Sequence, residues 1–228
     1  MSSGSKRAKV GFIHTTPSTI GMVENYMKEN LPDTEIVHIY DGNVKIDNFN
    51  SPIGITPKSN LLRYSVFGDQ LEKAGCSVVV SCCSLMPRAT LHAKKVVDVP
   101  FIQLDGVILD RVVEQYSRIG VINTTPYSVP YIEEGLKKRA DKLNKEIKLK
   151  FSNSNTALDF FNQGNFDEHD RIVINAVKKL AGEGLDCILM GQIPFGLMDE
   201  KLKNLALNIP ILYAGFEAFQ RIKELIEN

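Results

Sequence analysis

The sequence predicts an α/β protein made of two similar units, each with a parallel sheet covered by helices on both faces. Three observations lead to this prediction. Short runs rich in β-branched residues alternate with longer amphipathic segments along the chain. The pattern of the first half returns in the second half at a nearly constant spacing. A chain of 228 residues with 43% hydrophobic residues can also bury two cores.

The first half begins with a strand and then alternates. The predicted strands are 9–13, 35–40, 76–81 and 101–104, and the predicted helices are 18–30, 58–74 and 85–97. Pro87 is compatible with the last of these helices because it falls in the first turn. The long polar segment 41–57 is expected to be either a lid or binding loop, or an ordinary surface loop.

The second half repeats the alternation. The predicted strands are 118–122, 146–151, 186–190 and 211–213, and the predicted helices are 129–143, 167–181, 197–207 and 214–227. Residues 152–164 form the second long polar segment, with the same two interpretations. Because strands that alternate with helices need crossover connections, each unit is expected to be flavodoxin-like or Rossmann-like.

Charge and cysteine content exclude several classes of protein. Equal numbers of basic and acidic residues, 27 each, give no basic surface for nucleic acid. No apolar run is long enough for a membrane span, and the Ser- and Lys-rich start resembles a polar tail rather than a signal peptide. Two of the four cysteines are adjacent, which is untypical of a disulfide scaffold. We therefore expect a cytoplasmic protein without nucleic-acid or membrane partners.

The repeat is the strongest feature of the sequence. The segment GFIHTTPS begins at Gly11, and the similar segment GVINTTPY begins 109 residues later, at Gly120. The same spacing relates Gly75 to Gly184 and Cys82 to Gly191. Matches at two separate places with one spacing indicate an internal duplication.

The duplication predicts the domain organisation. Residues 9–108 should form the first unit, completed by the C-terminal helix 214–228, and residues 109–213 should form the second. The two units are expected to be related by a pseudo-twofold axis. Since ligands of α/β folds bind at the carboxyl ends of the strands, the active site is expected in the cleft between the units.

The Thr-Thr-Pro segments are candidate binding loops. Each lies between a predicted strand and a predicted helix, where Thr can cap the helix and Pro fits its first turn. Unpaired N–H groups and hydroxyls at a helix N-terminus can bind a carboxylate or phosphate. The alternative is that each segment is only a well-capped helix start. The residues concerned are Thr15, Thr16, Thr124 and Thr125.

Cys82 and Cys83 are candidate reactive groups. They follow a buried predicted strand and precede a predicted helix, whose N-terminus would lower the pKa of a thiol. Such a thiol suits a nucleophile or a proton-transfer base, although cysteine is also common in cores, as we expect for Cys76 and Cys187. No glycine-rich phosphate loop follows the first strand, and the spacing of Cys82, Cys83 and His92 does not fit metal ligands. No cofactor and no metal are expected.

These features resemble the aspartate/glutamate/hydantoin racemase superfamily, which also includes maleate isomerase and arylmalonate decarboxylase. The family's buried strand followed by a Cys-Asn-Thr-like motif corresponds to VVVSCCS at 78–84, and its Thr-Pro-Tyr loop corresponds to residues 125–127. The resemblance assigns Cys82 to the catalytic cysteine, or Cys83 if the alignment shifts by one residue. The substrate-binding residues that it implies are Thr15, Thr16, Ser84, Thr124, Thr125 and Tyr127.

One departure from the family matters for function. Racemases of the family carry a second cysteine after the matching strand of the second unit, where this chain has Gly191 followed by Gln192. Cys187 lies four residues too early to replace it. Arylmalonate decarboxylase also has one cysteine and a glycine, but it retains the second cysteine, whereas this chain retains the first.

The resemblance implies a cofactor-independent isomerase or racemase-like enzyme that uses Cys82 for proton transfer. It would act at the carbon next to a carboxylate of a small acid, such as an amino acid, a hydantoin or a dicarboxylate. With one thiol, the second face of the substrate would be served by Gln192, Tyr127, His14 or water. The alternatives are a one-cysteine decarboxylase and a non-catalytic protein that binds a small acid. Lys58 and Arg63 are weak candidates for a second carboxylate, and a homodimer is compatible with the family.

Overall fold

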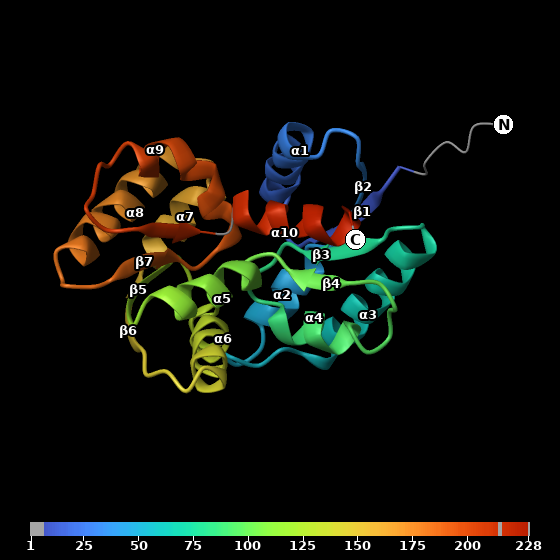
Figure 1. Ribbon diagram of the computed structural model, residues 1–228, viewed down its shortest axis with the longest axis horizontal. Helices are drawn as coiled ribbons and strands as arrows, with labels where there is room; N and C mark the ends of the chain where they lie inside the picture. Colours follow the sequence, from blue (N-terminus) through green and yellow to red (C-terminus); the bar gives the residue numbers. More distant parts are fainter. Residues whose placement is uncertain (1–6, 214–215, 228) are drawn as a thin grey trace. The chain divides into compact units, whose positions relative to one another are not determined.

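The structure of the chain is a computed structural model that describes residues 7–213 and 216–227 (Figure 1). Residues up to Leu104 form one compact unit with the C-terminal helix α10 (Phe216–Glu227), and residues from Asp105 form the other. Each unit contains a four-stranded parallel sheet, which confirms the predicted fold class. The first six residues of the polar tail, and the start of the last helix predicted at Ala214, lie outside the described residues.

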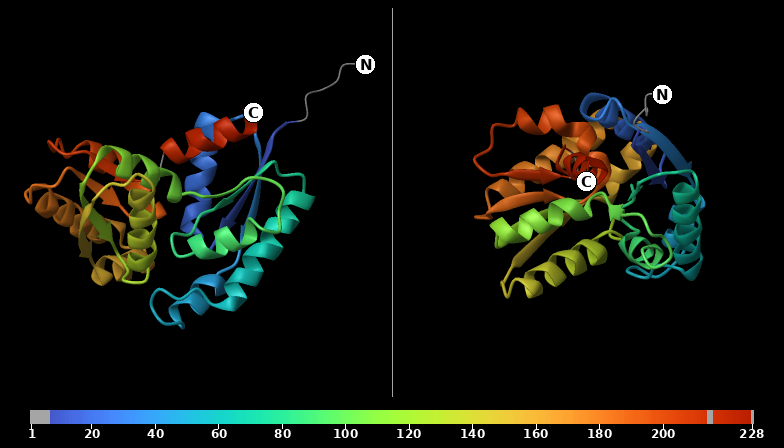
Figure 2. Two further views of the ribbon diagram at one scale, coloured as in Figure 1. Left: turned by 60° about the horizontal axis from the view of Figure 1, so that its bottom comes forward. Right: turned by 45° about the vertical axis from the view of Figure 1, so that its right-hand side comes forward.

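The first unit has one sheet with helices on both faces (Figure 2). Its strand order is β2 (Glu35–Tyr40), β1 (Lys9–His14), β3 (Val78–Ser81) and β4 (Phe101–Gln103). The helices are α1 (Ser18–Asn30), α2 (Asn43–Phe49), α3 (Lys58–Lys73), α4 (Pro87–Ala93) and α10. Helices α1 and α10 pack together, with the Tyr26 and Phe219 rings stacked at 4.7 Å between centroids.

The second unit repeats this architecture. Its strand order is β6 (Lys148–Asn153), β5 (Arg118–Asn123), β7 (Cys187–Met190) and β8 (Ile211–Tyr213). Apolar side chains of α5 (Gly106–Gln115) and α6 (Val129–Lys142) cover one face of the sheet, and those of α7 (Asn155–Asn162) and α8 (Phe166–Ala181) cover the other. A 3-10 helix η1 (Ile193–Met198) and the short helix α9 (Asp199–Lys203) follow β7.

The duplication extends to the register of the strands and to the conformation of the turns. Ile13 pairs with Ser81 in the first sheet, and Ile122, 109 residues after Ile13, pairs with Met190 in the second. The turns before β3 and β7 share a conformation, since Gly75 and Gly184 have φ of +85° and +70°. L side chains rarely adopt this region, which explains a glycine in both copies.

Each unit is completed by a helix from the other half of the sequence. The helix α5 follows β4 but belongs to the second unit, whereas α10 follows β8 but belongs to the first. In their respective units, α5 packs against α6 and α10 packs against α1. No helix in the described ranges is long and apolar enough to cross a membrane.

Several short helices differ from the sequence prediction. Helices α2 and α7 lie within the segments 41–57 and 152–164, which were expected to be loops, and α5 was not predicted. Helices of fewer than about 12 residues depend on tertiary contacts rather than on intrinsic propensity, so periodicity detects them poorly. The helix predicted at 85–97 is limited to α4, and it ends before the β-branched pair Val96 and Val97.

Candidate active site

Cys82 and Cys83 lie at the carboxyl end of a buried strand in the first unit. All four residues of β3 are buried, and the Cys82 amide donates a hydrogen bond of 2.9 Å to the carbonyl of Ile13, which continues the ladder with β1 by one residue. Cys82 is 2% exposed and Cys83 is 7% exposed, and neither is part of a disulfide. The strand therefore fixes both cysteines at the sheet edge where α/β proteins bind ligands.

The predicted helix N-terminus at the cysteines is wrong. Helix α4 begins at Pro87, five positions after Cys82, and a helix dipole acts on groups within its first turn. The loop is instead fixed by Gln103 of β4, whose Nε2 donates a hydrogen bond of 2.7 Å to the Cys83 carbonyl. The Thr90 hydroxyl donates to Oε1 of the same side chain at 2.8 Å. Gln103 and Thr90 thus position the cysteine loop, and the two thiols lie outside the range of the α4 helix dipole.

Lys45 of α2 interacts electrostatically with this loop. Burial lowers the pKa of Lys45 below its usual range, and the interaction with Cys83 acts in the opposite direction. The Nζ atom lies 5.5 Å from the centroid of the Phe49 ring, one helical turn further along. A partly desolvated ammonium group near Cys83 can stabilise a thiolate or a bound carboxylate. Sequence reasoning missed Lys45 because α2 was expected to be a loop.

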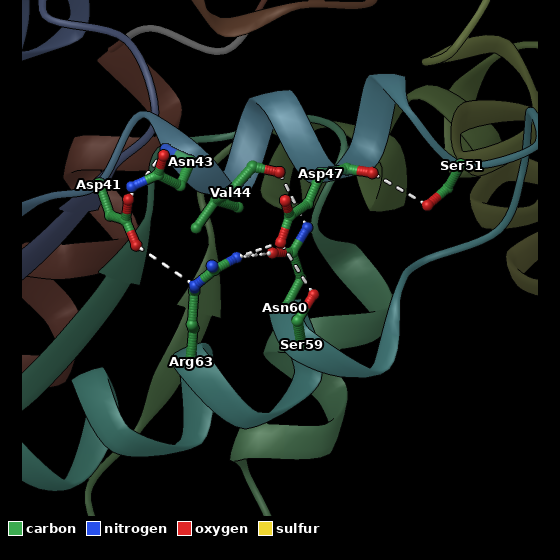
Figure 3. Close-up of polar contacts among 8 residues, drawn as sticks. All are labelled: Asp41, Asn43, Val44, Asp47, Ser51, Ser59, Asn60 and Arg63. Atoms are coloured by element: carbon green, nitrogen blue, oxygen red, sulfur yellow. Dashed lines mark hydrogen bonds and ion pairs between the residues drawn. The ribbon is translucent and has the colours of Figure 1, made fainter.

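Helix α2 is attached to α3 by a network of polar contacts (Figure 3). Arg63 of α3 lies 2.5 Å from the Asp47 carboxylate and 3.5 Å from that of Asp41. The hydrogen bond from Arg63 is the largest cause that lowers the pKa of Asp47 below its usual range. The buried Asn60 amide also donates 2.8 Å to the Val44 carbonyl. Arg63, a weak candidate for a second carboxylate, is thus used to position α2.

His14 forms a buried chain of hydrogen bonds at the end of β1. Its Nδ1 lies 2.8 Å from the Thr19 hydroxyl and its Nε2 lies 2.9 Å from Nδ1 of His38. The Thr19 hydroxyl donates its hydrogen to the Thr16 carbonyl at 2.8 Å, so it accepts from Nδ1–H of His14. Burial, followed by the charge of His38, lowers the pKa of His14 to about 3. His14 is therefore neutral near pH 7, and neither ring nitrogen is left to transfer a proton.

The two Thr-Thr-Pro loops have the same backbone construction. The Thr19 hydroxyl bonds to the carbonyl of Thr16, and Ser128, 109 residues after Thr19, donates 3.0 Å to the carbonyl of Thr125. The expected threonine caps are wrong, because neither α1 nor α6 has a side-chain cap. Thr15 and Thr125 are buried, whereas Thr16 and Tyr127 are half-buried. Side-chain to main-chain bonds three residues apart shape both loops.

At the matching edge of the second unit, Gln192 connects two loops. Its Oε1 accepts hydrogen bonds from both the amide and the hydroxyl of Thr124, at 2.6 and 2.9 Å. The donor end of the Gln192 amide is therefore directed away from Thr124. Because the hydroxyl hydrogen of Thr124 is used in this contact, Thr124 has only acceptor capacity left for a ligand. Ser84, the remaining predicted binding residue, is 8% exposed in the cysteine loop of the first unit.

Gly191 occupies a crowded position directly after β7. A Cβ at residue 191 would contact Oδ1 of Asn123 closer than atoms can approach, and it would lie 2.6 Å from Cδ1 of Ile132. Asn123, the last residue of β5, is 1% exposed. Within the described part of the chain, neither Oδ1 nor Nδ2 of Asn123 has a hydrogen-bond partner. In the sequence, Asn123 begins the second Thr-Thr-Pro segment and occupies the position of His14 in the repeat.

The remaining cysteines are poorly suited to chemistry. Burial raises the pKa of the Cys76 thiol, and burial together with Asp186 raises the pKa of the Cys187 thiol to about 12. Both were expected to be core residues, and both are buried. Within residues 7–213 and 216–227, no group of three His, Cys, Asp or Glu side chains is placed to hold a metal ion.

Comparisons with known proteins agree with this architecture. A family model described as Asp/Glu/Hydantoin racemase matches residues 58–218. No curated protein sequence matches the chain significantly. Glutamate racemase RacE1 from Bacillus anthracis is 16% identical with a TM-score of 0.69, covering 97% of this chain and 82% of its own. An aspartate racemase homologue from Pyrococcus horikoshii is 15% identical with a TM-score of 0.69, covering 96% of this chain and 99% of its own. A variant of arylmalonate decarboxylase is 11% identical with a TM-score of 0.56, covering 96% of this chain and 94% of its own. At these identities the likeness shows a shared fold.

Proposed function

The chain belongs to the Asp/Glu/hydantoin racemase family, and from this premise we propose that it is a cofactor-independent enzyme with Cys82 as its proton carrier. Its substrate is a small acid with a hydrogen on the carbon next to a carboxylate. The position of Cys82 carries the proposal. Cys82 extends β3 by one hydrogen bond to β1, and Gly191, at the family's second cysteine position, makes the equivalent 2.9 Å bond to Ile122.

The proposed step is a proton transfer at carbon. The Cys82 thiolate removes the proton from the substrate carbon and becomes a thiol, and the electron pair of the C–H bond moves into the adjacent carboxylate. Positive charge near that carboxylate stabilises the enolate-like intermediate. Lys45 is suited to this role because it is partly desolvated and interacts electrostatically with the same loop. Return of a proton from Cys82 to the same face gives exchange with retention of configuration. Inversion requires that water deliver the proton to the opposite face.

The other predicted binding residues have unequal support. Ser84 lies in the cysteine loop itself, two residues after Cys82. The participation of Thr15, Thr16, Thr125 and Tyr127 in binding the same substrate stays a prediction. Thr124 and Gln192 bind each other, so we propose that they act as a pair that shapes the second-unit loop.

A one-cysteine lyase is the second candidate function, and the side chains at the second-unit edge favour it. Gly191 stands where the family resemblance places the second cysteine, so this chain lacks the second thiol that racemases use as a proton carrier. A decarboxylase needs only one protonation. The carboxylate leaves as carbon dioxide, its bonding electrons remain on the carbon, and the Cys82 thiol then donates one proton to that carbon.

A panel of small acids and one hydantoin separates these functions. The protein is incubated in heavy water with L- and D-aspartate, L- and D-glutamate, allantoin and phenylmalonate. Proton NMR records exchange at the acidic carbon, chiral chromatography records inversion, and carbon dioxide release records decarboxylation. Exchange or inversion supports an isomerase, and decarboxylation to one enantiomer supports the lyase.

Cysteine variants test the assignment of the proton carrier. Cys82→Ala should reduce turnover by about 100- to 10,000-fold, the usual contribution of a positioned acid or base. Cys76→Ala is the matched control and should have full activity, because Cys76 is buried at the opposite end of β3. If Cys83→Ala abolishes turnover and Cys82→Ala does not, the alignment is shifted by one residue. If no acid in the panel binds or reacts, the proposed function is wrong.

A further inference from the structure

The first unit has a surface groove that the proposed function does not use. Helices α3 and α4 lie side by side (Figure 1), and the groove is where the segment 51–57 meets both of them. Its volume is about 290 Å³. The residues that line it come from these three segments, and all of them belong to the first unit. The groove is therefore complete within one unit.

The apolar walls of the groove are exposed to solvent. Ile55 is 51% exposed on one wall and Leu91 is 60% exposed on α4, whereas Leu61 of α3 is half-buried. Single exposed apolar side chains are ordinary, but a group of them on one surface marks a binding site. Five large apolar side chains on these three segments are more than half exposed: Ile53, Ile55, Leu62, Val66 and Leu91.

Basic side chains lie along α4 at the same groove. Arg88, His92 and Lys95 line it, and their spacing of four and three residues places them on one face of α4 and the turn that follows. Arg88 and Lys95 are exposed, and none of the residues that line the groove is acidic. The groove thus combines an apolar surface with a row of positive charge.

Hydrogen bonds hold the walls of the groove in place. Arg88 donates a hydrogen bond of 2.7 Å from Nη1 to the Gly54 carbonyl, which attaches the segment 51–57 to α4. The Ser65 hydroxyl donates to the Leu61 carbonyl at 3.0 Å, so it accepts from Nδ1–H of His92 at 3.1 Å. These contacts preform the groove, and a preformed site loses less conformational entropy when it binds a ligand.

The exposure of the walls favours a protein segment as the occupant. Small-molecule sites enclose most of their ligand, whereas Ile55 and Leu91 lie open to solvent. A bilayer surface is too flat to enter a groove. A helical segment can place apolar side chains three or four positions apart in such a groove and direct its charged side chains to the rim.

We propose that the groove binds an acidic amphipathic segment of a partner protein, with apolar side chains between Ile55 and Leu91 and carboxylates facing Arg88 and Lys95. The charge of the groove selects an acidic partner, because a basic segment would place like charges together. This surface is separate from the cysteine loop, since Thr90, the α4 residue that supports that loop, is 2% exposed.

A displayed peptide library tests the proposal without assuming a partner sequence. Random peptides of about 12 residues, roughly three helical turns, are displayed on phage and selected against the full chain. The enriched peptides should be acidic, with apolar residues three or four positions apart. Fluorescence anisotropy of these labelled peptides should show binding that weakens as salt is added. Leu91→Asp should weaken it by about tenfold or more, and Lys95→Glu by about three- to tenfold.

Leu143→Asp is the matched control, because Leu143 is a leucine of the second unit that is 51% exposed. It should bind the peptides like the wild type, and both leucine variants should keep the wild-type melting temperature. Cys82→Ala should also bind normally, so the result is independent of the proposed function. Enrichment of no peptide, peptides without acidic residues, or equal binding to Leu91→Asp would overturn the proposal. Binding to phosphatidylglycerol vesicles that Leu91→Asp abolishes would overturn it in favour of a membrane surface.

Discussion

The two units have the same backbone at the edge of the sheet but different side chains. Cys82 and Gly191 make equivalent amide hydrogen bonds to the neighbouring strands β1 and β5, and Thr19 and Ser128 both close the Thr-Thr-Pro loop. At the same edge, the first unit carries a pair of thiols and a buried histidine chain. The second carries Gly191 and the buried carboxamide of Asn123, which has no hydrogen-bond partner among the described residues.

The comparison separates what the scaffold requires from what chemistry requires. The glycine turns, the strand register and the hydroxyl-to-carbonyl bonds maintain the fold, and they are present in both copies. The side chains that differ are at the carboxyl ends of the strands, where they are not needed to form the sheet. The units therefore share a scaffold but carry different chemical groups.

The largest contrast concerns thiol reactivity. The thiolate is the form that reacts with iodoacetamide, and the pKa of about 12 at Cys187 lies three units above the ordinary value of 9.0. At pH 8 its thiolate fraction should be about 1,000-fold below that of an ordinary thiol. We expect Cys82 or Cys83 to be labelled well before Cys187, as measured by peptide mass spectrometry after brief treatment.

Cys76 serves as the internal reference for that experiment, because burial also raises its pKa. Labelling under denaturing conditions should make all four cysteines react at similar rates. Preferential reaction of Cys187 in the folded protein would contradict the placement of the reactive loop in the first unit.

The second contrast concerns how stability depends on pH, because His14 titrates and its counterpart Asn123 does not. The pKa of His14 is about 3 in the folded state and about 6.5 in the unfolded state, so the unfolded chain takes up a proton first. The free energy of unfolding should therefore fall as the pH drops from about 6.5 toward 3, by up to about 1.4 kcal/mol per pH unit from this residue. His14→Asn, which gives the first unit the residue of the second, should reduce that slope.

Urea unfolding at pH 7.5, 6 and 5 measures the slope in both proteins. Above pH 7 the His14→Asn substitution should not change the slope, because His14 is neutral in both states there. An acid slope that is the same with and without His14 would show that the buried chain of His14, His38 and Thr19 does not control acid stability.

Much of the fold could be predicted from local patterns in the sequence. Alternation predicted the strands β1 to β8, and the single spacing of 109 residues linked Gly75 to Gly184, whose turns share a left-handed conformation. The short helix α2 was missed because contacts from α3 stabilise it. Patterns along one strand or helix cannot show such contacts between segments.

Contacts between segments also limited how much of the candidate site could be predicted. The cysteine loop was located from its strand, but its attachment to Gln103 and the nearby Lys45 depend on packing. The φ of Gly191 is not in the left-handed region, so the constraint that favours glycine at this position is steric. The Asn123 side chain imposes that constraint from a neighbouring strand, and no local sequence signal reports it.

The smallest contrast concerns the two long segments after β2 and β6. In the first unit Arg63 attaches α2 to α3 through Asp47, whereas α7 of the second unit begins with a hydrogen bond from the Ala157 amide to the Ser154 hydroxyl at 3.3 Å.

Arg63→Met should weaken α2 by about 0.5 to 1 kcal/mol, because the ion pair is partly exposed. Hydrogen exchange should then speed up at α2 by about two- to fivefold and stay unchanged at α7. Lys58→Met, at an exposed position five residues earlier on α3, is the control. Since α2 carries Lys45, the Arg63 variant should also bind the substrate carboxylate more weakly. Unchanged exchange at α2 would show that the remaining contacts, such as the one from Asn60 to Val44, are enough to hold Lys45 in place.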